Sequence, residues 1–563
     1  MLSRARQVLA LSLALCVAAA VAAEEPATPQ YGGTLTVGSE FSGVSATAWD
    51  PADWHWKINH DAPYLEHLFV ADLAKSAERG GTFRFTSSFW IPDGVLKGEL
   101  AESWEFTGDP LTLVVRLRKG VMWPDKPGVM TAREFVADDV VFSFNRVRAS
   151  PKALKEYYEY IDRIEARDEH TVVFHLKAYN TEWARRFGYG LYCGILPREA
   201  ARLDLLGPKN AIGTGPFLLE SYRDGSAYIY ARNPGYWAKE GIGGTAYRLP
   251  FVDKLIYPVL KDSAGAQAAL RTGRLDILRN IPWQSVEALK QSSPQLVWHR
   301  RLSASGTFIA LRMDTKPFDS ILVRRAVNMA INRQEIVDKY YGGNAEPFNH
   351  PMYRDWRGYY QPLAEMPASV KELFLYDPER AKQLLRAAGY PAGFVFDVQV
   401  SGNNSNHLDL LAMVAGYLQK VGVTLNIKPM EYAPYASVLK NSKHAAGYMM
   451  TSAHITPIST LSRHFSSNIF WNASRYRDPA LDERLRRAQY IRDERERIEA
   501  VREMTVSVLE KAPYILLPTP IEYEAWWPWV KNYNGERYAG ALRPGPIYAR
   551  IWIDQSLKKT LGF

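Results

Sequence analysis

The sequence contains very few cysteines and no long apolar run. Only Cys16 and Cys193 occur in 563 residues, and no stretch reaches the roughly 20 consecutive apolar residues that a membrane-spanning helix needs. A single hydrophobic core stops growing at about 250–300 residues. The sequence therefore predicts two or more globular lobes that are held by their cores and not by disulfides.

Motifs of common enzyme classes are also missing. The sequence has no HExxH, no GxSxG, no phosphate-binding Walker A loop and no CxxC pair. His55, His60 and His67 lie close together, but no carboxylate or cysteine pattern of a metal site accompanies them. We therefore expect no metal, no cofactor and no catalysis.

Basic residues outnumber acidic ones without forming a basic block. The chain has 69 Lys and Arg against 60 Asp and Glu, a formal net charge of +9. The two signs are interleaved along the chain, and no nucleic-acid-binding motif accompanies them. This pattern is typical of a mixed, solvated surface, so we expect no nucleic-acid partner.

The first 23 residues have the pattern of a cleavable signal peptide. Arg4 and Arg6 precede an apolar segment at 8–17, and small residues at 21–23 form a cleavage site. Cys16 lies inside the apolar segment and follows a leucine, so we do not expect lipid attachment. The mature protein should begin at Glu24, carry a net charge of +7 because two arginines are lost, and reside in the periplasm.

Strand and helix patterns alternate along the mature chain. A glycine-bounded strand is expected at 33–38, and a helix with an acidic start at 138–147. The second half is more helical, and the helix at 378–388 has Asp377 as its N-cap and Gly389 beyond its end. The architecture should be α/β. Further strands are expected at 111–117, 171–176, 217–222, 227–230, 395–400 and 423–427, and further helices at 321–340 and 408–420.

An apolar stripe at helical spacing runs from Leu481 to Val508. Acidic and basic residues four positions apart lie opposite the stripe, with the acid first. This arrangement predicts a solvated helix face without a partner. The expected pairs are Asp482/Arg486, Glu483/Arg487 and Asp493/Arg497.

Several phrases occur in one order over nearly the whole mature chain. The pairing of GTGPF at 213–217 with RNPGYW at 232–237 is the most specific of them. The others include LAESW at 100–104, LRKGV at 117–121, DVVFS at 139–143 and DPERA at 377–381. On these phrases the chain resembles the family 5 extracellular solute-binding proteins of bacterial ABC importers, which bind oligopeptides, dipeptides, nickel or oligosaccharides.

The resemblance implies a two-lobed, periplasmic-binding-protein-like α/β fold of type II, with an extra inserted domain. Lobe I is expected to be discontinuous and to include 31–65, 195–305 and 515–563. The inserted domain should span 66–194, and lobe II should span 306–514. Ligand would be captured by closure about a hinge and passed to the transmembrane subunits of the importer. The protein is expected to be a monomer.

One departure from the family pattern concerns the ligand. Peptide binders of this family carry an aspartate that pairs with the peptide ammonium group, and Thr451 stands at the matching position in GYMMT, 447–451. No Asp or Glu occurs between Tyr432 and Arg477. A buried ammonium without a carboxylate carries a large desolvation cost. A free peptide N-terminus is therefore disfavoured unless Glu40 supplies the charge.

Aromatic residues make up 12% of the chain, and rings near the inferred cleft can stack on sugars or on peptide side chains. Peptide-like ligands remain the first expectation. An oligosaccharide or another neutral or anionic solute is the alternative, and a secreted hydrolase is the alternative of another class. The predicted ligand-binding residues are Glu40, Phe41, Ser42, Tyr435, Tyr448, Met449, Thr451 and Trp471.

Overall fold

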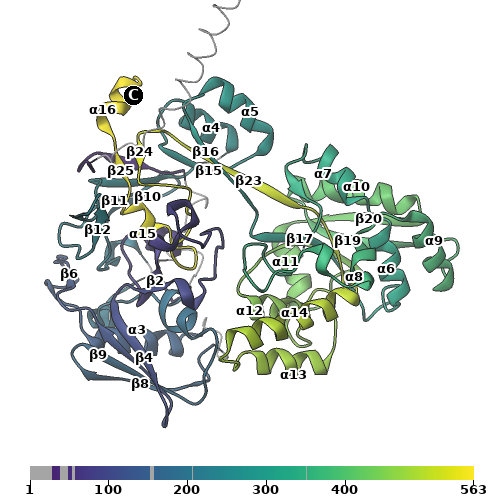
Figure 1. The fold of residues 1–563 in the computed structure, drawn as a ribbon, viewed down its shortest axis with the longest axis horizontal. Coiled ribbons are helices and arrows are strands. Elements are labelled where there is room, and N and C mark those ends of the chain that lie inside the picture. Colours follow the sequence, from purple (N-terminus) through teal and green to yellow (C-terminus); the bar gives the residue numbers. More distant parts are fainter. Residues whose placement is uncertain are drawn as a thin grey trace, which may run out of the picture.

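Two bodies joined by extended strands make up the molecule (Figure 1). The computed structural model describes residues 28–38, 49–52, 58–151, 157–205, 207–260, 262–349 and 351–563. The predicted signal peptide and the predicted site residues Glu40, Phe41 and Ser42 lie outside this part of the chain. Among the described residues, no helix combines the length and the apolar character needed to cross a membrane.

Lobe I is built on two sheets. In the first, strand β1 at the N-terminal end pairs in parallel with β14, about 220 residues later, and a β10–β11 hairpin extends the sheet. In the second, β23 lies between β15 and β16 and is antiparallel to both. The bounds are β1 Thr34–Thr36, β10 Phe217–Arg223, β11 Ala227–Arg232, β14 Lys254–Pro258, β15 Ile277–Ile281, β16 Val297–Leu302, β23 Thr519–Trp526, α4 Ser263–Arg271 and α5 Trp283–Ser292.

The segment predicted to be the inserted domain contains an antiparallel sheet in the order β4-β5-β9-β8, with helix α3 packed on it. Its core shares one hydrophobic cluster with lobe I. A buried hydrogen bond of 2.9 Å from Trp123 Nε1 to Asp139 fixes the start of the helix. The bounds are β4 Ala101–Thr107, β5 Thr112–Leu117, β8 Ile161–Asp168, β9 Thr171–Leu176 and α3 Ala137–Ala149.

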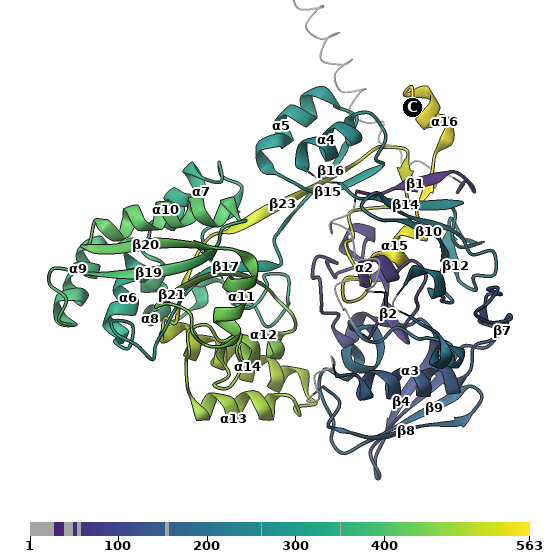
Figure 2. The same cartoon turned by 180° about the vertical axis from the view of Figure 1, so that it is seen from behind.

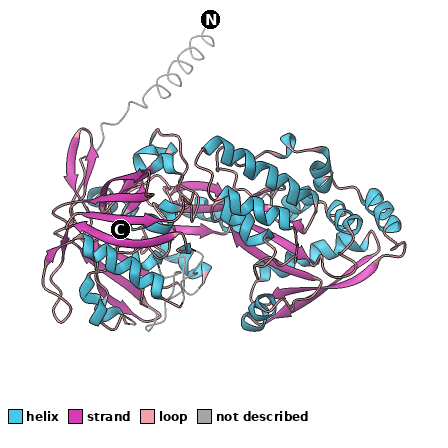
Figure 3. Cartoon of the chain, turned by 90° about the horizontal axis from the view of Figure 1, so that it is seen from below, coloured by secondary structure: helices cyan, strands magenta, loops and turns pink. Residues whose placement is uncertain are grey.

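Lobe II is a five-stranded sheet, in the order β20-β19-β21-β17-β22, covered by helices on both faces (Figure 3). Side chains of β17 alternate between the two cores, with Ile309 in one and Phe308 in the other, as the period-2 geometry of a strand requires. The strands are β17 Ser305–Leu311, β19 Phe394–Ser401, β20 Val423–Met430, β21 Gly447–Ala453 and β22 Tyr514–Leu516. The helices are α6 Ile321–Met329, α7 Arg333–Lys339, α8 Ala368–Lys371, α9 Pro378–Ala387, α10 Ser405–Gln419, α11 Tyr432–Lys440, α12 Pro457–Phe465, α13 Pro479–Ala488 and α14 Glu494–Glu510.

Two neighbouring crossovers connect lobe II to lobe I. Strand β16 continues into β17, and β22 continues into β23, the long strand that runs between the bodies in Figure 2. Backbone hydrogen bonds link the crossovers, from Ser303 N to Pro520 O at 2.9 Å and from Leu517 N to Thr307 O at 3.0 Å. A bridge of two extended strands is a hinge element, because few residues need to change conformation for the lobes to move.

Shorter elements complete the described chain. Most of them lie in lobe I or in the inserted domain, whereas β18 joins the hinge by pairing with β23. They include α2 Ile58–Asp61, β2 Phe69–Ala71, β3 Leu96–Gly98, β6 Met122–Trp123, β7 Arg133–Glu134, β12 Lys239–Ile242, β13 Thr245–Arg248, β18 Ala345–Glu346, β24 Val530–Lys531, α15 Gly545–Tyr548, β25 Trp552–Ile553 and α16 Gln555–Thr560.

The single helix predicted at 321–340 is wrong. The chain forms α6, which ends at Met329, and then α7, which begins at Arg333. Asn332 caps the second helix by accepting a hydrogen bond from Glu335 N at 3.0 Å. Both helices present apolar residues to one core, so their apolar pattern continues across the break and hides it in the sequence.

Candidate functional site

The parallel strands β19, β20 and β21 of lobe II end at the edge of the sheet that adjoins the crossovers. In open α/β sheets, ligands bind beyond the carboxyl ends of parallel strands. Ala453 and Ile455, at and beyond the end of β21, pack against the hydrophobic cluster of lobe I and the inserted domain. This strand edge therefore lies where the two bodies meet, and it is the candidate site.

Thr451 lies near the end of β21 and is exposed. It pairs across the sheet with Thr307 of β17, and the two hydroxyl oxygens are 2.7 Å apart. His407, in the first turn of α10, places Nε2 2.9 Å from the same Thr451 oxygen. The position predicted to face the ligand is thus surrounded by neutral polar groups.

Tyr448 and Met449 are placed differently from Thr451. They are 1% and 0% exposed, because β21 is an inner strand of a sheet covered on both faces. Tyr435 stacks on Tyr448 at 4.5 Å, and the Tyr448 hydroxyl donates a hydrogen bond to the Tyr435 carbonyl at 2.9 Å. In this structure all three are core residues with almost no surface for a ligand, and their role in binding stays a prediction.

Trp471 lies in the loop that follows α12. The guanidinium of Arg463 sits over its ring at 3.8 Å, and Phe470 packs beside it at 4.8 Å. The structure brings Trp471 together with these two residues. Its role in binding stays a prediction.

A buried carboxylate joins the inserted domain to lobe II, where α12–α14 lie beside that domain in Figures 1 and 2. Glu182 accepts hydrogen bonds from the hydroxyls of Thr456 and Ser459, in the first turn of α12, and from Arg186 at 2.6 Å. Burial opposes ionisation of Glu182, but the charges of Arg186 and Arg185 and the two hydroxyl hydrogen bonds outweigh it and lower its pKa to about 2. We call this contact the Glu182 latch.

Aromatic residues form a second contact between the same bodies. Trp90 of the inserted segment meets Trp356 and Tyr359 of lobe II edge-to-face, at 5.3 and 5.7 Å. The Thr86 hydroxyl donates to Asp355 of lobe II at 2.8 Å. Together with the latch, these contacts bring the bodies together on the side opposite the crossovers, so the structure is a closed form.

Strands β16 and β23 carry a buried ionic network at the base of the hinge. Glu524 is 0% exposed and lies 3.1 Å from both Arg301 and His299, and 3.6 Å from Arg279. Burial raises the pKa of Glu524, but the nearby cations dominate and lower it to about 2. The network holds these strands in one register at the point where the chain leaves lobe I.

A model of the bacterial extracellular solute-binding proteins, family 5 (middle region), matches residues 95–478. The chain belongs to this family. The resemblance seen in the sequence is thereby confirmed, as is the two-lobed α/β fold.

Curated relatives of this family 5 protein are binding proteins. Di/tripeptide-binding protein 2 of Pseudomonas aeruginosa is 29% identical over 95% of this chain and 97% of its own. Heme-binding protein A of Haemophilus influenzae is 27% identical over 77% of this chain and 81% of its own. The dipeptide-binding protein of Escherichia coli K12 is 26% identical over 77% of this chain and 83% of its own.

Solved structures share the fold of this family 5 protein. The periplasmic binding protein DppA of Helicobacter pylori, in complex with the peptide STSA, has a TM-score of 0.72 at 24% identity. The alignment covers 93% of this chain and 99% of that one. AgaA of A. tumefacien R10, in complex with agropinic acid, has a TM-score of 0.68 at 20% identity. That alignment covers 93% of this chain and 99% of AgaA.

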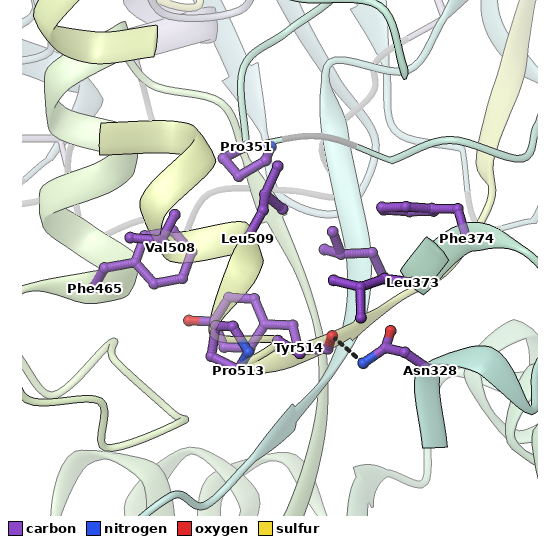
Figure 4. Close-up of a pocket in the computed structure, with 11 residues that line it drawn as sticks. Asn328, Pro351, Leu373, Phe374, Phe465, Val508, Leu509, Pro513 and Tyr514 are labelled. Carbon is purple, nitrogen blue, oxygen red and sulfur yellow. Dashed lines mark hydrogen bonds between the residues drawn. The ribbon is translucent and has the colours of Figure 1, made fainter. Parts of the chain in front are cut away.

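One cavity of this family 5 protein lies inside lobe II, and its lining includes none of the candidate-site residues. Figure 4 shows its lining, in which Asn328 donates a hydrogen bond to the Tyr514 carbonyl at 3.1 Å. Its volume of about 20 Å³ holds about one water molecule. The cavity is therefore a packing defect and too small for a solute.

Two of the three clustered histidines of this family 5 protein, His60 and His67, are buried packing residues. His60 stacks on Tyr228 at 4.1 Å, and His67 is buried, which lowers its pKa well below the ordinary value. No group of three or more potential metal ligands occurs in the described ranges. Sequence reasoning missed His407 and Glu182, because their partners lie 44 and 274 residues away.

Proposed function

We propose that this family 5 protein captures a peptide-like solute between its lobes and delivers it to the transmembrane subunits of an ABC importer. Two of the relatives described above are named for binding peptides, and DppA of Helicobacter pylori was solved in complex with a peptide. The observation that carries the proposal is the meeting of the lobe II strand edge with the other body across a two-strand hinge. A site placed there is completed only when the lobes close.

A neutral or anionic solute without a free amine is the second candidate. Thr451 and the acid-free stretch from Tyr432 to Arg477 favour it, and AgaA was solved in complex with agropinic acid. Native mass spectrometry of protein purified without unfolding tests the two candidates, because a bound solute adds its own mass. A co-purifying peptide supports the first candidate, and a non-peptide solute supports the second.

The protein is proposed to act without catalysis, as a monomer in the periplasm. Chromogenic esters, glycosides and peptides should stay intact in its presence, whereas turnover of any of them would support the hydrolase alternative. Intact mass of exported protein should correspond to a chain that begins at Glu24. A retained Met1, or a diacylglycerol mass on Cys16, would contradict the predicted processing.

A further inference from the structure

The hydroxyl of Thr451 contacts two polar atoms, Thr307 Oγ1 at 2.7 Å and His407 Nε2 at 2.9 Å. A hydroxyl has one proton to donate and two lone pairs that accept. The direction of these two hydrogen bonds therefore decides whether Thr451 offers a lone pair or its proton to a ligand.

His407 is 8% exposed, and its Nδ1 has no hydrogen-bond partner in the described part of the chain. Burial lowers the pKa of His407 to about 4, so the imidazole is neutral near pH 7 and carries one proton. A proton on Nδ1 would leave a buried N–H without an acceptor, which costs more than an unused lone pair. The proton therefore sits on Nε2, and His407 donates to Thr451.

Thr307 is also buried, at 7% exposed. Within the described residues, the Thr451 oxygen is the one hydrogen-bond partner of the Thr307 hydroxyl. The Thr307 proton therefore finds an acceptor only if Thr307 donates to Thr451. Both lone pairs of Thr451 are then occupied. The remaining proton of Thr451 points away from both neighbours, toward the exposed side of the residue.

We propose that Thr451 is a hydrogen-bond donor to the ligand, with His407 and Thr307 as the positioning residues that fix its polarity. The ligand group at this point is then an acceptor oxygen of a carbonyl or a carboxylate, and not an ammonium group. An ammonium group can only donate hydrogen bonds, and here it would face the donor proton of Thr451. This inference rests on the proposed function, because it requires the ligand to reach the end of β21.

The direction of the hydrogen bonds is tested without any ligand. Nitrogen-15 NMR of histidine-labelled, full-length protein near pH 7 distinguishes the two neutral tautomers, and the His407→Gln variant identifies the His407 signals. We expect the proton on Nε2. A proton on Nδ1 would overturn the proposed polarity.

Contact with the ligand is tested by calorimetry with two probes, tri-alanine and N-acetyl-tri-alanine. Thr451→Val, which keeps the shape and removes the donor, should weaken binding of the acetylated probe by about fivefold to twentyfold. Thr451→Ser should retain binding within about threefold, since it keeps the hydroxyl. Equal affinity of wild type and Thr451→Val would overturn the contact.

The positioning role of Thr307 has its own pair of variants. Thr307→Val should reduce affinity for N-acetyl-tri-alanine, and Thr307→Ser should restore it, because only the hydroxyl holds Thr451 in place. Loss in both variants would contradict the role. If wild type binds neither probe, the peptide function fails, while the tautomer measurement still decides the polarity of Thr451.

Discussion

Glu66 shows how one buried side chain couples folding to pH. It is 1% exposed, and Trp237 Nε1 donates a hydrogen bond to its carboxyl at 3.0 Å. Burial, and secondly the charge of Glu99, raises its pKa from an ordinary 4.5 to about 8. The folded protein thus keeps a proton on Glu66 at a pH at which the unfolded chain has lost it.

The free energy of unfolding should therefore fall as pH rises from 4.5 to 8, because the unfolded state releases this proton first. Glu66→Gln cannot ionise, so this part of the pH dependence should disappear. Relative to the variant, the free energy of unfolding of wild type should fall by roughly 2–5 kcal/mol between pH 5 and 8. This range follows from about 1.4 kcal/mol per unit of pKa shift. Thermal unfolding over this range measures it, with exposed Glu169→Gln as control. Parallel curves for wild type and Glu66→Gln would contradict the assignment.

The neutral hydroxyl of Thr451 should make binding insensitive to the charge of a peptide N-terminus. Because wild type offers a neutral hydroxyl, acetylation of the N-terminus of tri-alanine should not lower its affinity more than about twofold, whereas a buried charge that loses its partner costs 2 kcal/mol or more. The Thr451→Asp variant should instead bind the free-amine peptide more tightly than the acetylated peptide. Calorimetry at two salt concentrations separates long-range charge from local contact. If wild type binds only the free-amine peptide tightly, the amine anchor lies elsewhere, with Glu40 as the first residue to test.

At the scale of elements, helix α12 is held by a residue of the other body. Thr456 caps the helix by accepting from Ser459 N at 3.0 Å, and its hydroxyl also donates to Glu182. The carboxylate lies at the positive end of the helix dipole, which favours its ionised form. The start of α12 in lobe II therefore also binds Glu182 of the other body.

Glu182→Gln should loosen this latch, because charge-assisted hydrogen bonds contribute about 1.5–3 kcal/mol. The ligand-free protein should then populate more open states, its radius of gyration should rise, and its apparent affinity for peptide should fall about tenfold. Ser459→Ala should act in the same direction with a smaller effect. Small-angle X-ray scattering and calorimetry are the measurements.

Glu483→Gln is the matched control, since Glu483 also pairs with two arginines but on the exposed face of α13. Identical scattering of Glu182→Gln and wild type would show that the latch does not hold the lobes.

At the scale of the whole molecule, the closed arrangement must open for a solute to enter. A ligand that contacts both lobes binds the closed state better, so it shifts the population toward closure. Saturating tri-alanine should lower the radius of gyration of the full chain and shift its tryptophan emission, since Trp90 and Trp356 meet across the lobes. An unchanged scattering profile at saturation would indicate a site that is already closed without ligand or that has no hinge.

Several helices and strands could be predicted from local sequence patterns alone. Strand β9 was predicted at its observed bounds, and α9 within one residue, because alternation and capping residues are local signals. Of the predicted ion pairs, Glu483–Arg487 forms, whereas Asp482 accepts from Ser467 N and Asp493 caps α14. Helix spacing fixes which residues are neighbours and leaves open which partner each one takes.

Which side chains meet around the proposed binding residue Thr451 depends on tertiary packing. Thr451 was found from the sequence, but its partners Thr307 and His407 come from other elements, and the Glu182 latch joins residues 274 positions apart. Tyr448 and Met449 share a strand with Thr451, yet helices on both faces bury them. Local periodicity gives the side of a strand on which a residue lies, whereas long-range packing decides what covers that side.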